Sequence, residues 1–127
     1  MIRSAEDLLQ ELSSLDESQR IEAKRGAQID RSVMETVCAF ANEPGLGGGY
    51  LLLGVVRDQH DLFSNAYSVV GVDNPDKLQS DLASQCASVF NRPVRPRVAV
   101  ETLNGRPVVV AYVPEAAPTD KPVFLSN

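Results

Sequence analysis

The chain has 127 residues, which is enough for one domain with a substantial hydrophobic core. Hydrophobic residues make up 43% and charged residues 23% of the chain, a composition typical of globular proteins and not of disordered chains. The net charge of −5 argues against a protein that binds nucleic acid over its whole surface. A local basic surface is still compatible with this charge, because residues 82–100 include Arg92, Arg95 and Arg97 and no acidic residue.

No part of the sequence indicates export or membrane insertion. No stretch approaches the roughly 18 apolar residues that a membrane helix needs, and the N-terminal residues lack the apolar region of a signal peptide. Cys38 and Cys86 each occupy an apolar position of an expected helix. Buried free thiols in a reducing cytoplasm are the simpler interpretation, and a disulfide is the alternative. We therefore expect a cytoplasmic protein without a membrane partner.

Three segments combine a helical spacing of apolar residues with a start signal. Ser4 and Asp30 are N-cap candidates, and Asn74 is another that is followed directly by proline. Apolar residues recur at intervals of three and four after each cap. These patterns predict helices over residues 5–15, 31–42 and 75–89.

The strand signals centre on Tyr50 to Val56, an apolar run that follows a glycine-rich break. Such a run predicts one strand buried on both faces, with Gly54 marking a bulge or a close backbone approach. Asn104-Gly105 is a strong hairpin turn signal. Shorter strands are expected within residues 17–25, 67–72, 98–102, 108–113 and 121–125.

The expected order of elements is α-β-α-β-β-α-β-β-(β). This order predicts a single α+β domain over residues 1–127, with a mixed or antiparallel sheet and helices mainly on one face. The sequence stops just after an apolar strand-like segment. We therefore expect the domain to be the N-terminal part of a longer protein.

The glycines at positions 45 and 47–49 have two interpretations. A glycine run can cradle a phosphate with its backbone N–H groups. In a nucleotide-binding P-loop, however, a strand precedes the glycines and a lysine follows them, whereas here a helix precedes them and no lysine follows. A tight helix-to-strand connection is favoured, and ATP is not expected as a cofactor. The lone His60 falls in a polar loop, where a solvated histidine is more common than a ligand or a catalytic base.

Three acidic residues are candidates for a metal site. Glu17 and Glu22 flank or occupy a short strand, and Asp58 follows the central strand. If these strands are neighbours, the three carboxylates and Lys24 converge at one end of the sheet. Three carboxylates suit Mg²⁺ or Mn²⁺ and phosphodiester cleavage. Solvated surface acids, or an ion-pair site in which Lys24 neutralises the cluster, are the alternatives.

Several motifs together resemble a known family. They are Glu17-x4-Glu22-Ala23-Lys24, Ala39-Phe40-Ala41-Asn42, the block Gly48-Gly49-Tyr50-Leu51-Leu52-Leu53-Gly54-Val55, and Val69-Val70-Gly71-Val72. With these motifs the sequence resembles the Schlafen/Alba-like DNA-binding domain over about residues 6–125. The resemblance implies an α+β domain that precedes a longer C-terminal region in bacterial or archaeal proteins described as transcriptional regulators.

The same resemblance implies a ribonuclease site. In the Schlafen nucleases two glutamates and an aspartate carry catalysis, and Glu17, Glu22 and Asp58 occupy the matching positions, with Lys24 beside them. These three acids would then be the ligands of Mg²⁺ or Mn²⁺.

The leading expectation for function is nucleic-acid binding, to DNA or RNA, with phosphate contacts from Arg92, Arg95 and Arg97. A metal-dependent ribonuclease is the alternative. A dimerisation module without nucleic acid is a third interpretation, because an uncovered apolar strand at the end of the chain invites pairing with a second copy. We expect a homodimer.

Overall fold

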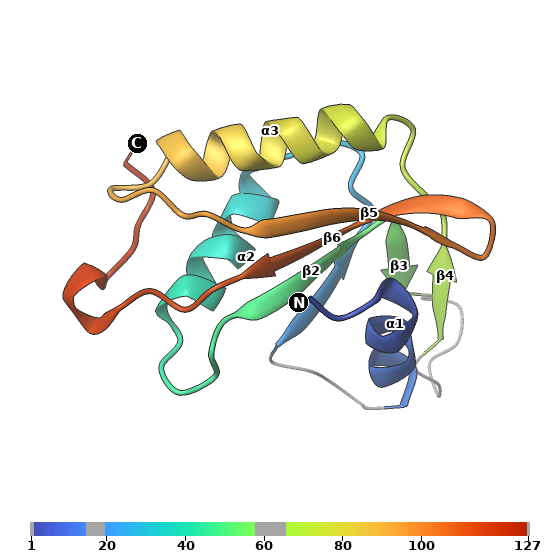
Figure 1. Ribbon diagram of the computed structural model, residues 1–127, viewed down its shortest axis with the longest axis horizontal. Coiled ribbons are helices and arrows are strands. Elements are labelled where there is room, and N and C mark those ends of the chain that lie inside the picture. Colours follow the sequence, from blue (N-terminus) through green and yellow to red (C-terminus); the bar gives the residue numbers. More distant parts are fainter. Residues whose placement is uncertain (1, 15–19, 58–65, 127) are drawn as a thin grey trace.

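The computed structural model describes residues 2–14, 20–57 and 66–126 (Figure 1). The elements in chain order are α1 (Ala5–Ser14), β1 (Ile21–Lys24), α2 (Arg31–Asn42), β2 (Gly49–Leu53), β3 (Val55–Arg57), β4 (Tyr67–Val69), α3 (Pro75–Ser88), β5 (Arg97–Leu103), β6 (Arg106–Val113) and the 3-10 helix η1 (Pro118–Asp120).

The helices begin where the sequence predicted, because polar side chains cap them. The Ser4 hydroxyl accepts a hydrogen bond from the Asp7 N–H (3.2 Å), and the Asp30 carboxylate accepts one from the Val33 N–H (3.1 Å). Asn74 caps α3 in the same way, with proline at the first helical position. Each cap satisfies a backbone donor that has no partner within its helix.

The larger sheet has four strands in the order β1-β2-β6-β5. Strands β1 and β2 are parallel, whereas β6 is antiparallel to both β2 and β5, so the sheet is mixed. Asn104 and Gly105 have φ values of 52° and 76° in the turn between β5 and β6, which confirms the predicted hairpin. A second sheet pairs β3 with β4. The α+β fold class is confirmed.

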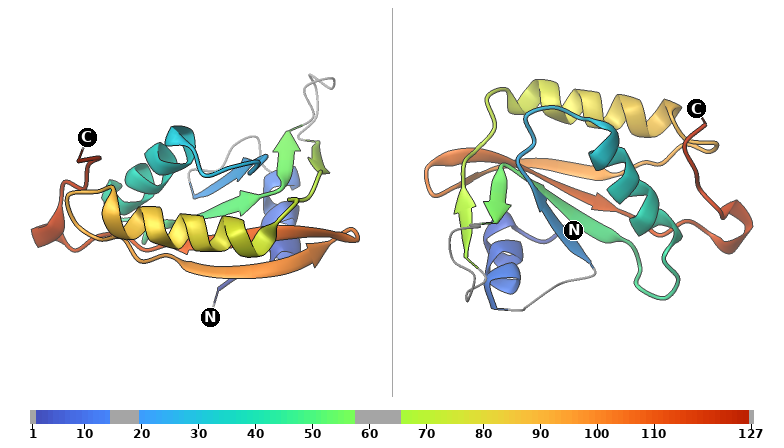
Figure 2. Two further views of the ribbon diagram at one scale, coloured as in Figure 1. Left: turned by 90° about the horizontal axis from the view of Figure 1, so that it is seen from above. Right: turned by 180° about the vertical axis from the view of Figure 1, so that it is seen from behind.

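Strand β2 lies at the centre of the core, and all five of its residues are buried. Its side chains alternate between two hydrophobic clusters. Leu51 and Leu53 pack with α2 and α3, whereas Tyr50 and Leu52 pack with α1. Two of the three helices therefore cover one face of the sheet and α1 covers the other, as the two views of Figure 2 show.

Gly54 divides the run that the sequence predicted as one strand. Its φ is +105°, a left-handed conformation that side-chain-bearing residues rarely adopt. Its carbonyl accepts hydrogen bonds from the N–H groups of Val70 (2.8 Å) and Gly71 (2.9 Å). The chain thereby leaves the large sheet at Gly54, and β3 begins the small sheet.

Three further expectations need correction. Residues 121–125 form no strand, and Leu125 makes a single bridge with Phe90. The strand expected over 67–72 ends at Val69, because the backbone then turns to contact Gly54. Arg97 is the first residue of β5, although the sequence placed it in a loop.

Both cysteines are free thiols, as expected from the sequence. Cys86 is fully buried in the cluster beneath α3, and burial raises the pKa of its thiol to about 12. Cys38 is partly buried, and its thiol donates to the carbonyl of Val123 (3.0 Å). Within the described ranges no helix has the length and apolar character of a membrane span.

Candidate functional site

The three arginines of the expected basic loop have different surroundings. Arg92 forms an ion pair with Asp120 at 3.6 Å (Nη1 to Oδ1), and Arg95 is exposed. Arg97 is also exposed and lies directly opposite Tyr112 in the β5–β6 ladder. Paired residues of neighbouring strands project to the same face, so Arg97 lies on the face of the sheet that α1 partly covers. The role of these arginines in binding stays a prediction.

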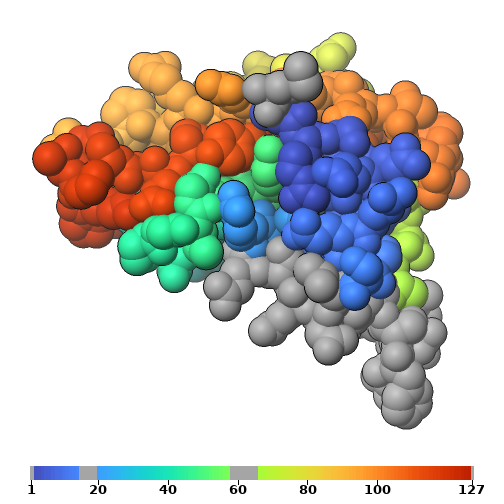
Figure 3. Space-filling model, turned by 60° about the horizontal axis from the view of Figure 1, so that its bottom comes forward, coloured from blue at the N-terminus to red at the C-terminus, as the bar shows by residue number. Residues whose placement is uncertain are grey.

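A hollow on that face is built around two tyrosines. Tyr50 of β2 pairs with Tyr112 of β6, and their ring centroids lie 5.1 Å apart at an interplanar angle of 48°. The hollow has a volume of about 500 Å³, within the range of small-ligand sites. We call it the tyrosine pocket; its lining residues are Ile2, Arg3, Glu11, Arg20, Tyr50, Arg97 and Tyr112. The N-terminal segment and α1 (blue) meet β1 (light blue) and β2 (green) on the face shown in Figure 3.

Hydrogen bonds hold both tyrosine rings in place. The Tyr50 hydroxyl accepts from the Arg3 N–H (3.2 Å), and the Tyr112 hydroxyl donates to the Gly47 carbonyl (2.6 Å). Both hydroxyl groups therefore have partners within the protein, and of the two rings that of Tyr112 is the more exposed.

The guanidinium of Arg3 is already engaged by acids of α1. It donates to Asp7 (2.7 Å) and to Glu11 (2.9 Å), and it lies 5.9 Å from the centroid of the Tyr50 ring. The hydrogen bond to Asp7 is the main reason why the pKa of Arg3 is raised above its ordinary value. Arg97, in contrast, makes no ion pair with any residue in the described part of the chain.

Of the acidic site predicted from the sequence, the structure describes Glu22 and Lys24 only; Glu17 and Asp58 lie outside the described residues, as does His60. Strand β1 pairs with β2, but the strand that directly precedes position 58 is β3 of the small sheet, so this pairing does not test whether Asp58 lies beside Glu22. Lys24 Nζ lies 3.9 Å from a carboxylate oxygen of Glu22 and donates to the Ser32 hydroxyl at 2.9 Å. The lysine side chain is 18% exposed and that of Glu22 is 49% exposed.

A shallow groove of about 320 Å³ runs beside Glu22, between β1 and α2, and Glu35 lines it as well. Among the residues that the structure describes, no three His, Cys, Asp or Glu side chains are grouped so that they could hold a metal ion. Because two of the three predicted ligands lie outside the described residues, the metal site stays a prediction.

The glycine-rich turn supports the interpretation as a tight connection. A side chain at Gly48 would collide with the carbonyl oxygen of Val113, and the residue has a φ of +90°. The Gly47 N–H donates to the carboxylate of Glu115 (2.9 Å), which also binds Lys121 (2.7 Å). The hydrogen bond from Lys121 is the main cause that lowers the pKa of Glu115. A carboxylate of the protein itself thus occupies an N–H group that a phosphate would need.

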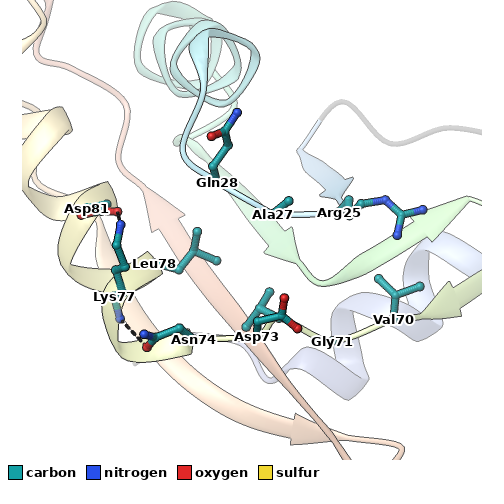
Figure 4. Close-up of a pocket in the computed structure, with 12 residues that line it drawn as sticks. Arg25, Ala27, Gln28, Val70, Gly71, Asp73, Asn74, Lys77, Leu78 and Asp81 are labelled. Carbon is teal, nitrogen blue, oxygen red and sulfur yellow. Dashed lines mark hydrogen bonds and ion pairs between the residues drawn. The ribbon is translucent and has the colours of Figure 1, made fainter.

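A second pocket of about 280 Å³ lies where the segment after β1 approaches the start of α3 (Figure 4). Its charged side chains include Arg25 and Asp73, and Lys77 pairs with Asp81 at 2.7 Å. Asn74 also lines the pocket, but its side chain caps α3. Three of its polar side chains, those of Asn74, Lys77 and Asp81, are thus engaged with one another or with the backbone of α3.

The sequence analysis did not identify the tyrosine pocket. Tyr50 is the one polar side chain of the central strand, and Tyr112 stands in an otherwise apolar return strand. A tyrosine within each of two apolar strands was the only sign of this pocket in the sequence. Their pairing depends on the β2–β6 register, and the contribution of Arg3 depends on where α1 packs, so the sequence pattern alone did not bring them together.

Two solved protein structures are similar to this chain. The solved N-terminal domain of a "Putative ATP-dependent DNA Helicase RecG-related Protein" from Nitrosomonas europaea is 55% identical to the chain, with a TM-score of 0.90 over 99% of this chain and 82% of that one. The DIP2311 protein from Corynebacterium diphtheriae is 22% identical, with a TM-score of 0.56 over 88% of this chain and 20% of that one, and it shows the fold alone. No curated protein gives a significant match.

The family model described as Schlafen, AlbA_2 matches residues 17–124, which is most of the chain. The match covers the glycine turn and every strand of both sheets. The resemblance found in the sequence motifs is thereby confirmed, and the chain belongs to the Schlafen/AlbA_2 family.

Proposed function

We propose that the chain is a nucleic-acid-binding domain of a bacterial transcriptional regulator. Membership of the Schlafen/AlbA_2 family supports this proposal. A further support is the similarity to the N-terminal domain of a protein whose name relates it to a DNA helicase, which is a class of enzyme that acts on nucleic acid. Neither the family nor that name decides whether this chain binds DNA or RNA, so the proposal covers either.

The observation that carries the proposal is the position of Arg97. Its exposed guanidinium lies on the rim of a hollow that Arg3 and Arg20 also line, so three arginines from separate segments share one surface. Arg92 and Arg95 precede Arg97 in the chain and add two positive charges to the same segment. A localised group of arginines on a domain with a net charge of −5 favours phosphate binding at one place.

The experiment is a titration of labelled DNA and labelled RNA at about 50 and 200 mM salt. Binding should weaken steeply as salt rises, because phosphate contacts release condensed counterions. Replacement of Arg92, Arg95 and Arg97 by glutamine should weaken binding and flatten the salt dependence by about one unit of log–log slope for each phosphate that is no longer bound.

Arg31→Gln is the matched control, since it removes an exposed arginine from α2, on the opposite face of the sheet. Its binding should equal that of the wild type. The absence of any binding at low salt would refute the proposal.

A metal-dependent ribonuclease is the second candidate function. The observation in its favour is that β1 holds Lys24 beside Glu22, fixed by the Ser32 hydroxyl, at the position where the family resemblance places catalytic groups. Mg²⁺ or Mn²⁺ would be held by Glu17, Glu22 and Asp58 and would supply activation of water. The described residues contribute one of these carboxylates.

Cleavage of a structured RNA in the presence of Mn²⁺ tests this candidate. Glu22→Gln should abolish cleavage, whereas Glu6→Gln, at an exposed acid of α1, should leave it intact. If the wild type does not cleave, the Glu22–Lys24 pair is structural. The ion pair is largely exposed on the Glu22 side, so its loss should then cost less than about 1 kcal/mol of stability.

A homodimer is a further proposal, although the terminal segment is not the uncovered strand that the sequence predicted. The terminal segment expected as an uncovered strand is instead held by the side chain of Asn42. Within the large sheet, β1 and β5 are the edge strands that a second copy could extend. Light scattering over a range of concentrations distinguishes a dimer from a strict monomer.

A further inference from the structure

We propose that the tyrosine pocket binds an unpaired nucleotide, with its base stacked on the ring of Tyr112 and its phosphate on Arg97. This inference rests on the proposed nucleic-acid-binding function and narrows it to single strands. It assigns the pocket lined by Tyr50 and Tyr112 as the place where a base is held, apart from the groove that Glu22 and Glu35 line between β1 and α2.

The two tyrosine rings differ in how far a base can reach them. Tyr50 is 8% exposed and is held beneath the N-terminal segment by its bond with the Arg3 N–H. Tyr112 is only partly buried and lies next to it at a tilt of 48°. Tyr50 therefore supports the ring of Tyr112 from one side, and Tyr112 presents the more accessible π surface. Every base can stack on such a surface, so the contact requires no particular sequence.

The polar groups of the pocket differ in whether they already have partners within the protein. Both tyrosine hydroxyls and the Arg3 guanidinium already have partners within the chain. Arg97 has no ion pair within the described ranges and stands directly across the ladder from Tyr112. An aromatic face with an adjacent, uncommitted guanidinium is the pair of groups that single-stranded nucleic-acid sites combine. Glu11 also lines the tyrosine pocket, and its carboxylate would repel a phosphate bound close to it. The phosphate is therefore better placed beside Arg97.

The pocket is also fixed before any ligand arrives. The Tyr112 hydroxyl is tied to the backbone of the glycine turn at 2.6 Å, and Tyr112 itself pairs with Tyr50 and Arg97 in the centre of a four-stranded sheet. A ring held in this way loses little freedom when a base stacks on it. A base within a duplex already stacks on its neighbours and cannot enter, so the pocket should discriminate between single strands and duplexes.

The test compares a fluorescent oligothymidylate of about ten nucleotides with a duplex of equal length, both titrated by anisotropy at low salt. For Tyr112→Leu we expect roughly tenfold or greater loss of affinity for the single strand, and little change for the duplex. Tyr112→Phe keeps the ring and loses the hydroxyl bond, so it should bind the single strand more tightly than Tyr112→Leu does. Tyr67→Leu alters a partly buried tyrosine of β4 outside the pocket and is the matched control for loss of an aromatic ring.

Ultraviolet crosslinking of the bound oligothymidylate, followed by mass spectrometry, gives a second readout. The crosslinked peptide should contain Tyr112 or Tyr50. If Tyr112→Leu binds single strands as well as Tyr112→Phe does, or if crosslinks fall elsewhere, the inference is wrong while the proposed function stands. If the wild type binds neither probe at low salt, the inference is wrong, and the proposed function is refuted as well if labelled RNA also stays unbound. Thermal unfolding of each variant verifies that it is folded.

Discussion

Asn42 and Val123 form a reciprocal pair of hydrogen bonds across 81 positions of the chain. The side-chain N–H of Asn42 donates to the Val123 carbonyl at 2.7 Å, and the Val123 N–H donates to the Asn42 side-chain oxygen at 2.7 Å. The amide thus pairs with the backbone as a neighbouring strand would. Asn91 bonds the two residues that flank Val123, accepting from the Phe124 N–H (2.7 Å) and donating to the Pro122 carbonyl (3.1 Å). Two asparagine side chains therefore hold a segment that joins no sheet.

The first prediction concerns this attachment. Asn42→Ala leaves the partly buried N–H of Val123 without its protein partner and removes one donor from its carbonyl, so it should cost about 2–3 kcal/mol of unfolding free energy. Asn91→Ala removes the equivalent pair at an exposed site, where water replaces the lost bonds, and should cost about 1 kcal/mol or less. Urea unfolding measures both values. Equal costs for the two variants would show that the burial of the Asn42 pair is not important.

The second prediction distinguishes two costs of replacing a glycine in the glycine-rich turn: a steric clash of the new side chain, and an unfavourable backbone conformation. Gly45→Ala and Gly48→Ala both place a side chain at positive φ, which costs about 1–2 kcal/mol. The new methyl group meets nothing within 4 Å at Gly45, but at Gly48 it collides with the backbone of Val113. Gly48→Ala should therefore destabilise the protein by several times as much as Gly45→Ala, as judged by thermal unfolding. Similar melting temperatures for the two variants would contradict this account.

The third prediction is a pH dependence that arises from Glu115. Its pKa is lowered in the folded state, mainly by the hydrogen bond from Lys121 and then by that from the Gly47 N–H. A lowered pKa contributes stability that is fully present above the ordinary value of about 4.5 and is lost as the pH falls through the folded value below it. Glu115→Gln should therefore be less stable than the wild type near neutral pH, and the difference should shrink below about pH 4.5.

Chemical denaturation of the wild type and Glu115→Gln, at about pH 7 and about pH 3.5, measures this difference. Glu43→Gln removes an exposed glutamate at the start of the glycine-rich turn and is the control for loss of a carboxylate. A constant stability difference across the pH range would show that the Glu115 carboxylate contributes nothing through its ionised form.

The fourth prediction uses the two thiols as reporters of burial. The Cys86 thiol is fully buried and has a pKa of about 12, so it carries almost no reactive thiolate at neutral pH. Cys38 is partly exposed, and burial raises its pKa as well. In native conditions a thiol reagent should label Cys38 slowly and Cys86 only through unfolding, as mass spectrometry of the labelled peptides would reveal. Labelling of Cys86 ahead of Cys38 would contradict the packing of α3.

The sequence predicted the helices well because their information is local. Ser4, Asp30 and Asn74 cap the helices at the expected residues, since a cap and its target N–H lie within three positions of each other. The hairpin at Asn104-Gly105 was equally local. The division of the central strand at Gly54 does not depend on local information, because the N–H groups that bind the Gly54 carbonyl belong to residues 70 and 71. The terminal segment was misjudged for the same reason, since Asn42 and Asn91 are remote from it in sequence.

The sequence by itself determined the family, the α+β class and the positions of the capped helices, because motifs, periodicity and caps depend on residues close together in the chain. Only the tertiary structure decided which side chains share a surface. It paired Tyr50 with Tyr112 and Tyr112 with Arg97 through strand register, and it brought Arg3 over the same face through the packing of α1. Register and helix docking are set by the burial of side chains from distant segments, which no local pattern specifies.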